Sequence, residues 1–354
     1  MHVHLLCPGL LWPAKALHDT AFDLDLPAFS RLLGRARLSW GAPQGSEDWL
    51  CTHFGISGAA PVAALRLLGE GVDPGQQIWL CADPEHLGFE QGRLLLANAP
   101  PEVDAGELQA LLQEVAPLLQ RELPDFRELR AGAAGSGHAY LRLAALPALR
   151  LMAPSLARSG NAHFALPTGP DAAAWIRLGN ALQMLLHNLA QNRQREASGQ
   201  ATLNTLWFWG AGALPPPPPA SRPAPHDAVY GQGPLIAGLA RWARRAAPPL
   251  PQRAAQLEGG GRHLVCVDEL AAPARELDAN AWRQALLRLE RDWFAPLAAA
   301  LFSGRLQSLR ITALGREASV DVQLGRSAVL KFWRRPCPIT RLVAPAEGPE
   351  KAAP

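Results

Sequence analysis

The stretch 203–212, L-N-T-L-W-F-W-G-A-G, joins an apolar, tryptophan-rich run to a Gly-x-Gly turn, and the prolines of 215–219 follow almost at once. Because the run is short and is bounded by residues that interrupt regular structure, it predicts a buried strand. Glycines at its carboxyl end let a backbone approach a ligand closely, and ligands of open α/β sheets bind at that end. The alternative is a purely structural core strand, in which the polar side chain of Asn204 needs a hydrogen-bond partner.

The composition indicates a soluble globular protein of two domains, or one large α/β domain with an insertion. Of 354 residues, 48% are apolar and 18% are charged, and the net charge is +3. Neither sign forms a long block, so nothing indicates nucleic-acid binding. No apolar run approaches the roughly 18 residues that a membrane span needs. The apolar amino terminus lacks a basic region and is broken by Pro8 and Pro13, so a first core strand is expected there rather than a signal peptide.

The cysteines indicate the compartment. There are five, an odd number, widely spaced and without a C-x-x-C pair. This usage is typical of a reduced, cytoplasmic protein, which is where we expect this chain.

Hydrophobic periodicity predicts an alternation of strands and helices along the chain. In the first part we expect a strand at 3–7, helices at 26–33, 104–121 and 171–195, and a hairpin of 77–82 with 89–97. Between them, Gly45 and Ser46 begin a short helix with acidic residues in its first turn.

The second part begins with the proline-rich segment 214–226, predicted to be a stiff loop. We expect a buried strand at 263–270 that ends near Asp268, and a helix at 281–301 bent by Pro296. Three alternating strands should follow at 309–314, 318–324 and 327–333, and residues 345–354 should be disordered.

With these motifs in place, the chain resembles the alkaline phosphatase superfamily, on the branch of the archaeal-type, cofactor-independent phosphoglycerate mutases. The run N-T-L-W-F-W-G-A-G at 204–212 matches the signature N-x-L-W-x-W-G-x-G, and Asn192 and Arg195 precede it as in that branch. The segment P-Q-G-S-E-D-W-L-C-T-H-F-G at 43–55 resembles the nucleophile segment, and L-G-E-G-V-D-P-G at 68–75 a further family motif. The W-F-W-G-x-G strand also resembles the RpfE-type regulatory protein group within this branch.

The resemblance implies metal-dependent phosphoryl transfer, in which two divalent ions activate a serine or threonine. The nucleophile position matches Ser46, and Asp268 matches a family acid. The metal positions mostly fail to match, since Pro8 stands where the family has a bridging aspartate. The expected histidines fall near Ala272, 314–315 and 325–326, and no histidine follows His263.

Several polar residues have both a structural and a functional interpretation. Ser46 could be a helix cap or a nucleophile. His53 could lie near Ser46, and His2 with His4 shows a metal-like spacing in which no third ligand is evident. A Ser-His-acid triad is not indicated because no G-x-S-x-G is present.

Other residues could bind a ligand. Asn192 and Arg195, one helical turn apart, could hold a phosphate or carboxylate. The other predicted ligand-binding residues follow them in the sequence: Asn204, Trp207, Trp209, Gly210 and Gly212.

These observations predict an α/β fold with a mostly parallel sheet of the alkaline phosphatase type. Its core should comprise 1–56 and 200–344, with an inserted α+β lobe at 57–199. We expect a non-catalytic relative of the mutases, without a cofactor, that has a regulatory role and binds a small phosphorylated or anionic ligand or a protein partner.

Two alternatives stay open. One is an active mutase or phosphatase that uses Ser46, Asp268 and a divalent ion such as manganese or zinc. The other is an interaction module that uses the loop 214–226.

Overall fold

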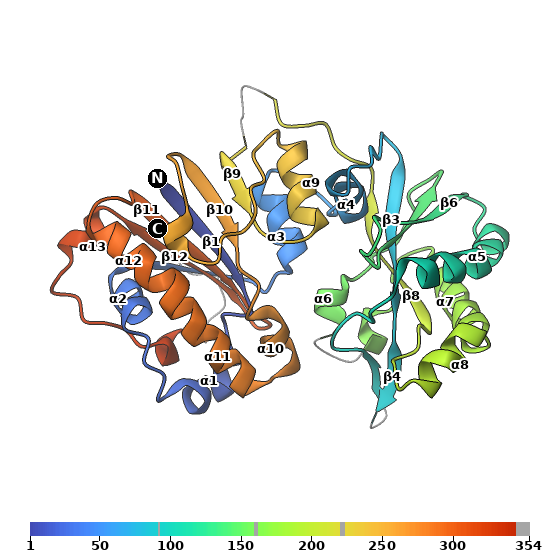
Figure 1. The fold of residues 1–354 in the computed structure, drawn as a ribbon, viewed down its shortest axis with the longest axis horizontal. Coiled ribbons are helices and arrows are strands. Elements are labelled where there is room, and N and C mark those ends of the chain that lie inside the picture. The colour runs from blue at the N-terminus through green and yellow to red at the C-terminus, as the bar shows by residue number, and fades with distance from the viewer. Residues whose placement is uncertain (91–92, 159–161, 220–223, 345–354) are drawn as a thin grey trace. The chain divides into compact units, whose positions relative to one another are not determined.

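The computed structural model describes residues 1–90, 93–158, 162–219 and 224–344. The chain divides into two compact units, unit 1 (Met1–Trp49, Pro219–Ile236 and Ala243–Pro354) and unit 2 (Leu50–Pro218 and Ala237–Trp242). The division falls inside two helices, α3 (Ser46–His53) and α9 (Pro234–Trp242). The elements of each unit are labelled in Figure 1.

Unit 1 contains a six-stranded sheet with the order β2-β12-β11-β1-β10-β9. Its central strand β1 is parallel to β10 and β11, and β10 is parallel to β9. Strand β12 is antiparallel to both of its neighbours, so the sheet is mixed but mostly parallel. The strands are β1 (His2–Pro8), β2 (Arg37–Gly41), β9 (Ala228–Tyr230), β10 (Arg262–Cys266), β11 (Ser308–Leu314) and β12 (Ser319–Gly325).

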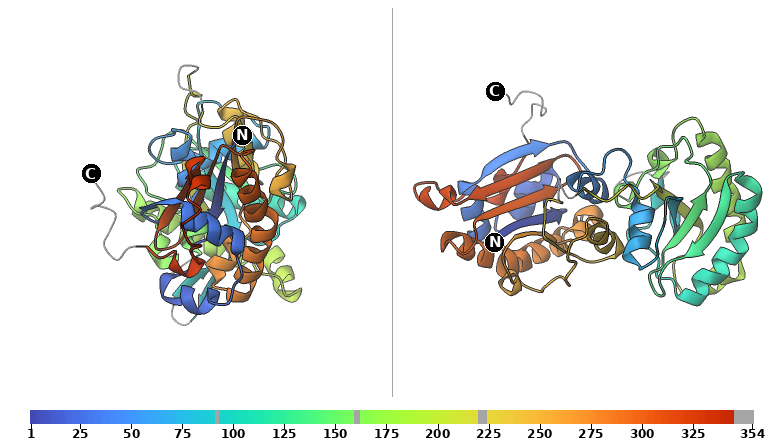
Figure 2. Two further views of the ribbon diagram at one scale, coloured as in Figure 1. Left: turned by 90° about the vertical axis from the view of Figure 1, so that its left-hand side faces the viewer. Right: turned by 90° about the horizontal axis from the view of Figure 1, so that it is seen from above.

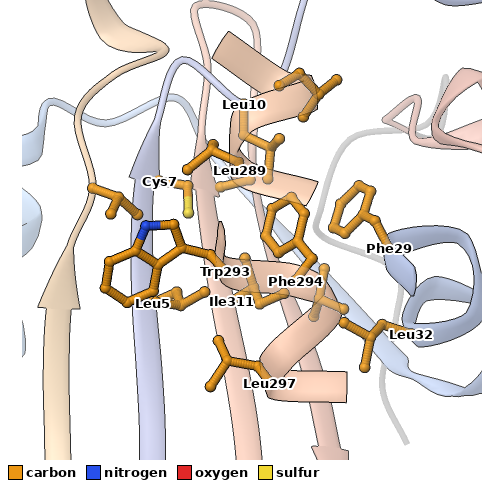
Figure 3. Packing of buried hydrophobic residues seen from close by; sticks show 14 of the residues in the cluster. Leu5, Cys7, Leu10, Phe29, Leu32, Leu289, Trp293, Phe294, Leu297 and Ile311 are labelled. Atoms are coloured by element: carbon orange, nitrogen blue, oxygen red, sulfur yellow. The ribbon is translucent and has the colours of Figure 1, made fainter. Parts of the chain in front are cut away.

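Helices cover one face of this sheet, and Figure 2 shows the α11–α12 stretch lying along it. Figure 3 shows Trp293 and Phe294 pointing from this stretch toward β1 and α2, where Phe294 stacks on Phe29 with ring centroids 4.5 Å apart. The helices of unit 1 outside α3 and α9 are α1 (Ala14–Ala21), α2 (Pro27–Arg35), η2 (Ala254–Gln256), α10 (Ala271–Glu276), α11 (Ala279–Leu289), η3 (Glu290–Phe294), α12 (Ala295–Phe302), α13 (Ser327–Leu330) and η4 (Ile339–Arg341).

The alternation of side chains along β1 gives the sheet two different faces. Val3, Leu5 and Cys7 point into the helix-covered core and are at most 2% exposed. His2 and His4 therefore point to the opposite face. His2 Nδ1 lies 2.8 Å from Ser308 Oγ, and His4 Nε2 lies 2.7 Å from Thr312 Oγ1. One face of the sheet is thus the main core, and the other carries polar groups next to its centre.

The helix predicted at 281–301 is interrupted by a π-helical turn, η3, between α11 and α12. Pro296 lacks a backbone N–H and lies in the first turn of α12, where that group has no helical partner in any case. The π turn places Glu290 at the amino end of α2, and its carboxylate accepts hydrogen bonds from Ala28 N and Phe29 N. Burial raises the pKa of Glu290, and these two hydrogen bonds act against that shift.

Unit 2 contains a four-stranded sheet with the order β6-β7-β3-β8, in which every pairing is antiparallel, and a separate hairpin of β4 with β5. Its strands are β3 (Ile78–Glu85), β4 (Leu87–Glu90), β5 (Arg93–Leu96), β6 (Phe126–Ala131), β7 (Ala139–Leu143) and β8 (Thr205–Gly212). Its helices are α4 (Val62–Gly69), α5 (Ala105–Glu122), α6 (Pro154–Ala157), η1 (Ala162–Ala165), α7 (Ala172–His187) and α8 (Ala190–Ala197).

The α/β class is confirmed. The predicted core of 1–56 and 200–344 stays a prediction, beside the two compact units described above. The predicted strand at 203–212 exists as β8, yet it pairs with β3 in the antiparallel sheet of unit 2. Its Trp-rich run therefore forms no part of the parallel sheet.

Three local predictions were also wrong. Residues 89–97 do not pair with 77–82, because β4 and β5 pair with each other. The segment 171–195 forms two helices, separated at Asn188 and Leu189. The last predicted strand, 327–333, is the short helix α13 followed by turns.

Two further predictions concern other parts of the chain. The tail 345–354 lies outside the described residues, as does 220–223 of the proline-rich segment. Among the described residues, no helix combines the length and the apolar character needed to cross a membrane.

Candidate functional site

Ser46, the predicted nucleophile, is the first residue of α3 and is half-buried. Its hydroxyl donates a hydrogen bond to Glu47 Oε2 at 3.1 Å. Asp48 follows in the same first turn, and burial raises the pKa of its carboxyl. Ser46 thus begins a helix and has two acidic neighbours in the first turn. This position fits a purely structural residue at a helix start as well as a reactive serine.

Asp268, the second predicted catalytic residue, is exposed just beyond the carboxyl end of β10. Its backbone carbonyl accepts a hydrogen bond from Ala271 N, which leads the chain into α10. Gly9, at the end of β1, lies beside this turn: a Cβ on Gly9 would be 2.3 Å from the carbonyl oxygen of Leu270.

The positions that the resemblance assigns to metal ligands carry side chains that bind no divalent ion. Pro8 is in register with Leu314 of the neighbouring strand β11, and Gly9 N donates to the carbonyl of Leu314 at 2.8 Å. Ala272 lies in α10, and Gly325 is in register with Ser308 at the opposite end of β11. Proline, leucine, alanine and glycine supply no ligand, so these positions lack the implied ligand set, whereas Asp268 keeps its carboxylate.

The side chains predicted to bind a ligand at 204–209 form hydrogen bonds with the protein itself. Asn204 pairs with the backbone of Leu87 in both directions, each at 2.8 Å. The indole of Trp207 donates to the Met152 carbonyl, and that of Trp209 donates to Asp83. The partner that Asn204 requires is therefore the start of the β4–β5 hairpin.

Gly210 and Gly212 allow another segment to approach the strand closely, as predicted for a ligand. The segment that approaches is helix α4 of the same unit. Gly210 has φ +61°, and a Cβ there would lie 2.7 Å from Val62 Cβ in α4. A Cβ on Gly212 would lie 3.0 Å from Pro61 Cβ. The Gly-x-Gly turn thus lets the amino end of α4 pack directly on β8.

Asn192 and Arg195 hold the segment that leads from α8 into β8. Asn192 is 3% exposed, donates to the carbonyls of Leu186 and Leu203, and accepts from Leu203 N. Arg195 donates to both carboxylate oxygens of Glu107 and to two backbone carbonyls. Both side chains are buried in a structural network.

Two buried histidines lie side by side in unit 1. His4 lies on β1 and His226 precedes β9, and their ring centroids are 5.6 Å apart. They are 5% and 6% exposed.

Hydrogen bonds and ring contacts hold the His4 side chain on its face of the sheet. Its Nε2 lies 2.7 Å from Thr312 Oγ1, and Thr312 in turn donates to Asp321, which also binds Arg310. The His4 ring meets the edge of Trp49 at 5.3 Å and the ring of His226 at 5.6 Å.

The metal-like spacing of His2 and His4 has a structural explanation in the sheet. Each ring forms a hydrogen bond with a hydroxyl of the neighbouring strand β11, His2 with Ser308 and His4 with Thr312. His4 interrupts the apolar run of a central strand, and a buried polar ring requires partners.

The cysteines supply no reactive thiolate in the interior. Cys7, Cys51, Cys81 and Cys266 are buried. Burial raises the pKa of the thiols of Cys7, Cys81 and Cys266 far above the usual value, so these side chains stay protonated.

Comparisons with known proteins also find similarity to phosphoglycerate mutases. No family model matches the chain. It is 40% identical over 50 residues to a probable 2,3-bisphosphoglycerate-independent phosphoglycerate mutase of Geobacter sulfurreducens. That match covers 14% of this chain and 12% of the relative, a small fraction of its length.

Two solved structures are similar to the whole chain. A cofactor-independent phosphoglycerate mutase of Thermoplasma acidophilum has a TM-score of 0.45 and 16% identity, over 94% of this chain and 92% of the mutase. A protein of Pyrococcus horikoshii has a TM-score of 0.46 and 14% identity, over 92% of this chain and 87% of that one. The chain is thus similar in structure to an archaeal cofactor-independent phosphoglycerate mutase, and its α/β class follows from its own two sheets.

Proposed function

We propose that this chain is a non-catalytic relative of the cofactor-independent phosphoglycerate mutases, with a regulatory or binding role. Phosphoryl transfer of the type that the resemblance implies needs two divalent ions to activate the nucleophile and to neutralise charge on the phosphoryl group. The proposal concerns the loss of that two-ion chemistry.

The observation that carries the proposal is the set of residues at the positions that the resemblance assigns to metal ligands, among them Pro8, Ala272 and Leu314. Pro8 and Leu314 are in register at the carboxyl ends of the parallel strands β1 and β11, and Ala272 lies in α10, beyond β10. A carboxylate or imidazole is needed at each such position to hold an ion, and proline, alanine and leucine supply no ligand. Without ions, Ser46 keeps the reactivity of an ordinary hydroxyl group.

The alternative, an active phosphoryl transferase, is favoured by the hydrogen bond from Ser46 to Glu47. A carboxylate that accepts a serine proton could act as a general base, as nucleophilic catalysis requires. Such an enzyme would still need groups that stabilise the transferred phosphoryl group, and the carboxylates of Glu47 and Asp48 would repel that anion.

The test is an assay of the full chain with 3-phosphoglycerate and with p-nitrophenyl phosphate, in the presence of manganese or zinc ions. We expect any residual turnover to be the same for the wild type and the Ser46→Ala variant. Turnover that Ser46→Ala abolishes, while the variant remains folded, would establish the alternative instead.

The regulatory role implies that the chain binds a ligand or a partner protein. A small phosphorylated or anionic ligand and a protein partner both fit a regulatory role, and the W-F-W-G-x-G run supports placement near the RpfE-type group. A docking role for the proline-rich segment 214–226 is the second form of this proposal, since proline-rich segments bind aromatic-lined grooves. Deleting that segment without loss of partner binding would exclude this second form.

A further inference from the structure

We propose that a basic groove within unit 1 binds a phosphate group, carried by a small phosphomonoester or by a lipid headgroup. The groove lies at the amino end of β11 and the carboxyl end of β12, beside α2, the start of β2 and α13. Pro8 and Leu314 lie at the opposite ends of β1 and β11, so this is not the place that the resemblance assigns to catalysis. The groove gives a place to the anionic ligand of the proposed function, on which this inference rests, and it does not involve Ser46.

The charged side chains of the groove are all basic. Its volume is about 500 Å³, within the range of pockets that hold small molecules. Of the described residues that line it, none is acidic, and the basic ones are Arg35, Arg37, Arg310 and Lys331. Positive charges that line one hollow repel one another, and an anion bound among them would remove that repulsion.

Arg35, the last residue of α2, is the buried cation of the groove. It is 8% exposed, and its Nη1 donates to the carbonyl of Val329 at 3.4 Å. Within the described part of the chain, its Nε has no hydrogen-bond partner and no carboxylate pairs with the guanidinium. The carboxyl end of α2 offers only a partial negative charge. Because a buried charge normally requires a counter-charge, the missing partner is one that a bound anion would supply.

Arg31 adds a second positive charge beside Arg35. The guanidinium carbons of Arg31 and Arg35 lie 4.1 and 4.9 Å from the centroid of the Phe302 ring. Burial lowers the pKa of Arg35, and the charge of Arg31 lowers it further. The two arginines are four residues apart on one helix, where like charges are unfavourable. This end of unit 1 therefore has positive charge in excess of what its own contacts neutralise.

On the sheet, two arginines flank Gln323. Arg37 of β2 and Arg310 of β11 are its cross-strand partners, so the three side chains share one face. Nη2 of Arg310 binds Asp321, whereas its buried Nε has no partner among the residues that the structure describes. Arg37 and Gln323 are exposed. Donors from neighbouring strands are thus available to the oxygens of an anion.

These donors favour a phosphate group over other anions. Guanidinium groups form paired, charge-assisted hydrogen bonds with phosphate oxygens. A phosphomonoester carries about 1.5 to 2 negative charges at neutral pH and has three acceptor oxygens, whereas a carboxylate has a single charge and two oxygens. Lys331 adds a point charge at the rim. We therefore expect a phosphomonoester to bind more tightly than a carboxylate of similar size.

The same phosphate group can come from two sources, because exposed apolar residues adjoin Lys331. Leu330, Phe332 and Trp333 are 68%, 79% and 67% exposed. Aromatic and apolar side chains beside basic ones are typical of segments that bind an anionic membrane surface. A soluble phosphomonoester and a phosphomonoester headgroup present the same chemistry to the groove, and the experiment separates them.

The experiment is a calorimetric titration of the full chain with glycerol 3-phosphate, paired with sedimentation of the chain with phosphatidylcholine vesicles that contain phosphatidic acid. Both probes carry a phosphomonoester on glycerol. Binding of glycerol 3-phosphate would assign a soluble ligand, and binding to the phosphatidic acid vesicles alone would assign a lipid headgroup. Glycerol and pure phosphatidylcholine vesicles should not bind.

Variants locate the phosphate. Arg35→Met keeps an unbranched side chain and should weaken binding roughly 10- to 100-fold, the loss expected for hydrogen bonds to a charged group. Without ligand it should unfold in urea no more easily than the wild type, because the change breaks no ion pair and removes a buried charge. Arg37→Gln changes an exposed side chain and should weaken binding about 2- to 5-fold.

Arg288→Gln is the matched control. It also removes one positive charge from unit 1, but Arg288 pairs with Glu269 and does not line the groove. It should bind the phosphate probe as the wild type does. Circular dichroism of each variant checks that it is folded.

Three results would overturn the proposal. One is a wild type that binds neither probe at millimolar concentrations. Another is unchanged binding in the folded Arg35→Met and Arg37→Gln variants, and the third is an equal loss in Arg288→Gln, which would indicate an effect of net charge alone. None of these results bears on the loss of two-ion chemistry, which the assay of Ser46→Ala tests separately.

Discussion

At the residue scale, the best-defined electrostatic feature is the buried pair of Arg66 and Asp83 in unit 2. The guanidinium donates to both carboxylate oxygens, at 2.8 and 3.1 Å, and Trp209 donates to the same carboxylate at 2.8 Å. The side chains of Arg66 and Asp83 are 6% and 13% exposed. Trp209 of the signature strand thus has a structural partner, and Asp83 links that strand to α4.

This pair predicts a specific dependence of stability on pH. Burial raises the pKa of Asp83, but the charge of Arg66 and the hydrogen bonds from Arg66 and Trp209 outweigh it, so the pKa lies below its ordinary value of 3.8. A carboxyl group with a depressed pKa stabilises the fold above its unfolded-state pKa. That stabilisation is lost as the pH falls through the depressed value.

Asp83→Asn should therefore destabilise the protein at neutral pH by about 3–5 kcal/mol, because it leaves a buried guanidinium without its counter-charge. The difference from wild type should shrink as the pH falls below about 4, which urea unfolding at several pH values would measure. Asp23→Asn, in an exposed pair with Arg283, is the control and should change stability far less than Asp83→Asn does. A loss for Asp83→Asn that does not vary with pH would contradict the assignment.

Several individual residues could be anticipated from the sequence, and others could not. The polar amide of Asn204 inside an apolar strand indicated a required partner, and the structure supplies Leu87. The roles of Asn192 and Arg195 were ambiguous, because an amide and a guanidinium can bind either a ligand or a backbone. Only the folded chain shows that their hydrogen bonds are made within the protein.

At the scale of elements, the packing of α4 on β8 depends on Gly210. Its positive φ of +61° disfavours other residues, and a Cβ would lie 2.7 Å from Val62 Cβ. The contact joins a helix to the edge strand β8 of the antiparallel sheet, so a change there should affect the stability of unit 2.

Gly210→Ala should lower the free energy of unfolding by about 2 kcal/mol or more, since it adds a steric clash to backbone strain. Gly58→Ala separates the two effects: its φ is +83° and a Cβ would meet nothing within 4 Å. It should cost about 1 kcal/mol from backbone strain alone. Chemical denaturation of the two variants gives the comparison, and equal losses would show that the contact with Val62 is unimportant.

Elements were predicted more reliably than their partners. The strands β1, β8, β10, β11 and β12 all follow from short apolar or alternating runs. Periodicity does not specify pairing, however, and the Trp-rich run fits an antiparallel edge as well as a parallel sheet. The π turn η3 could not be predicted, because it depends on the approach of Glu290 to the amino end of α2.

At the scale of the whole molecule, each unit has its own sheet and core, and the unit 1 sheet has two chemically different faces. One face packs Leu5, Ile311 and Trp293 under helices, and the other places His4, Thr312 and Asp321 together. The strand ends that the resemblance assigns to metal binding are apolar.

The most direct test of this account is the metal content of the full chain after equilibration with equal concentrations of zinc and manganese ions and removal of unbound metal. Elemental analysis should find fewer than two ions per chain and no retained manganese, because Pro8, Ala272 and Leu314 stand where the resemblance places ligands of a two-ion centre. Two ions per chain, or retained manganese, would contradict the account and would restore Ser46 as a candidate nucleophile.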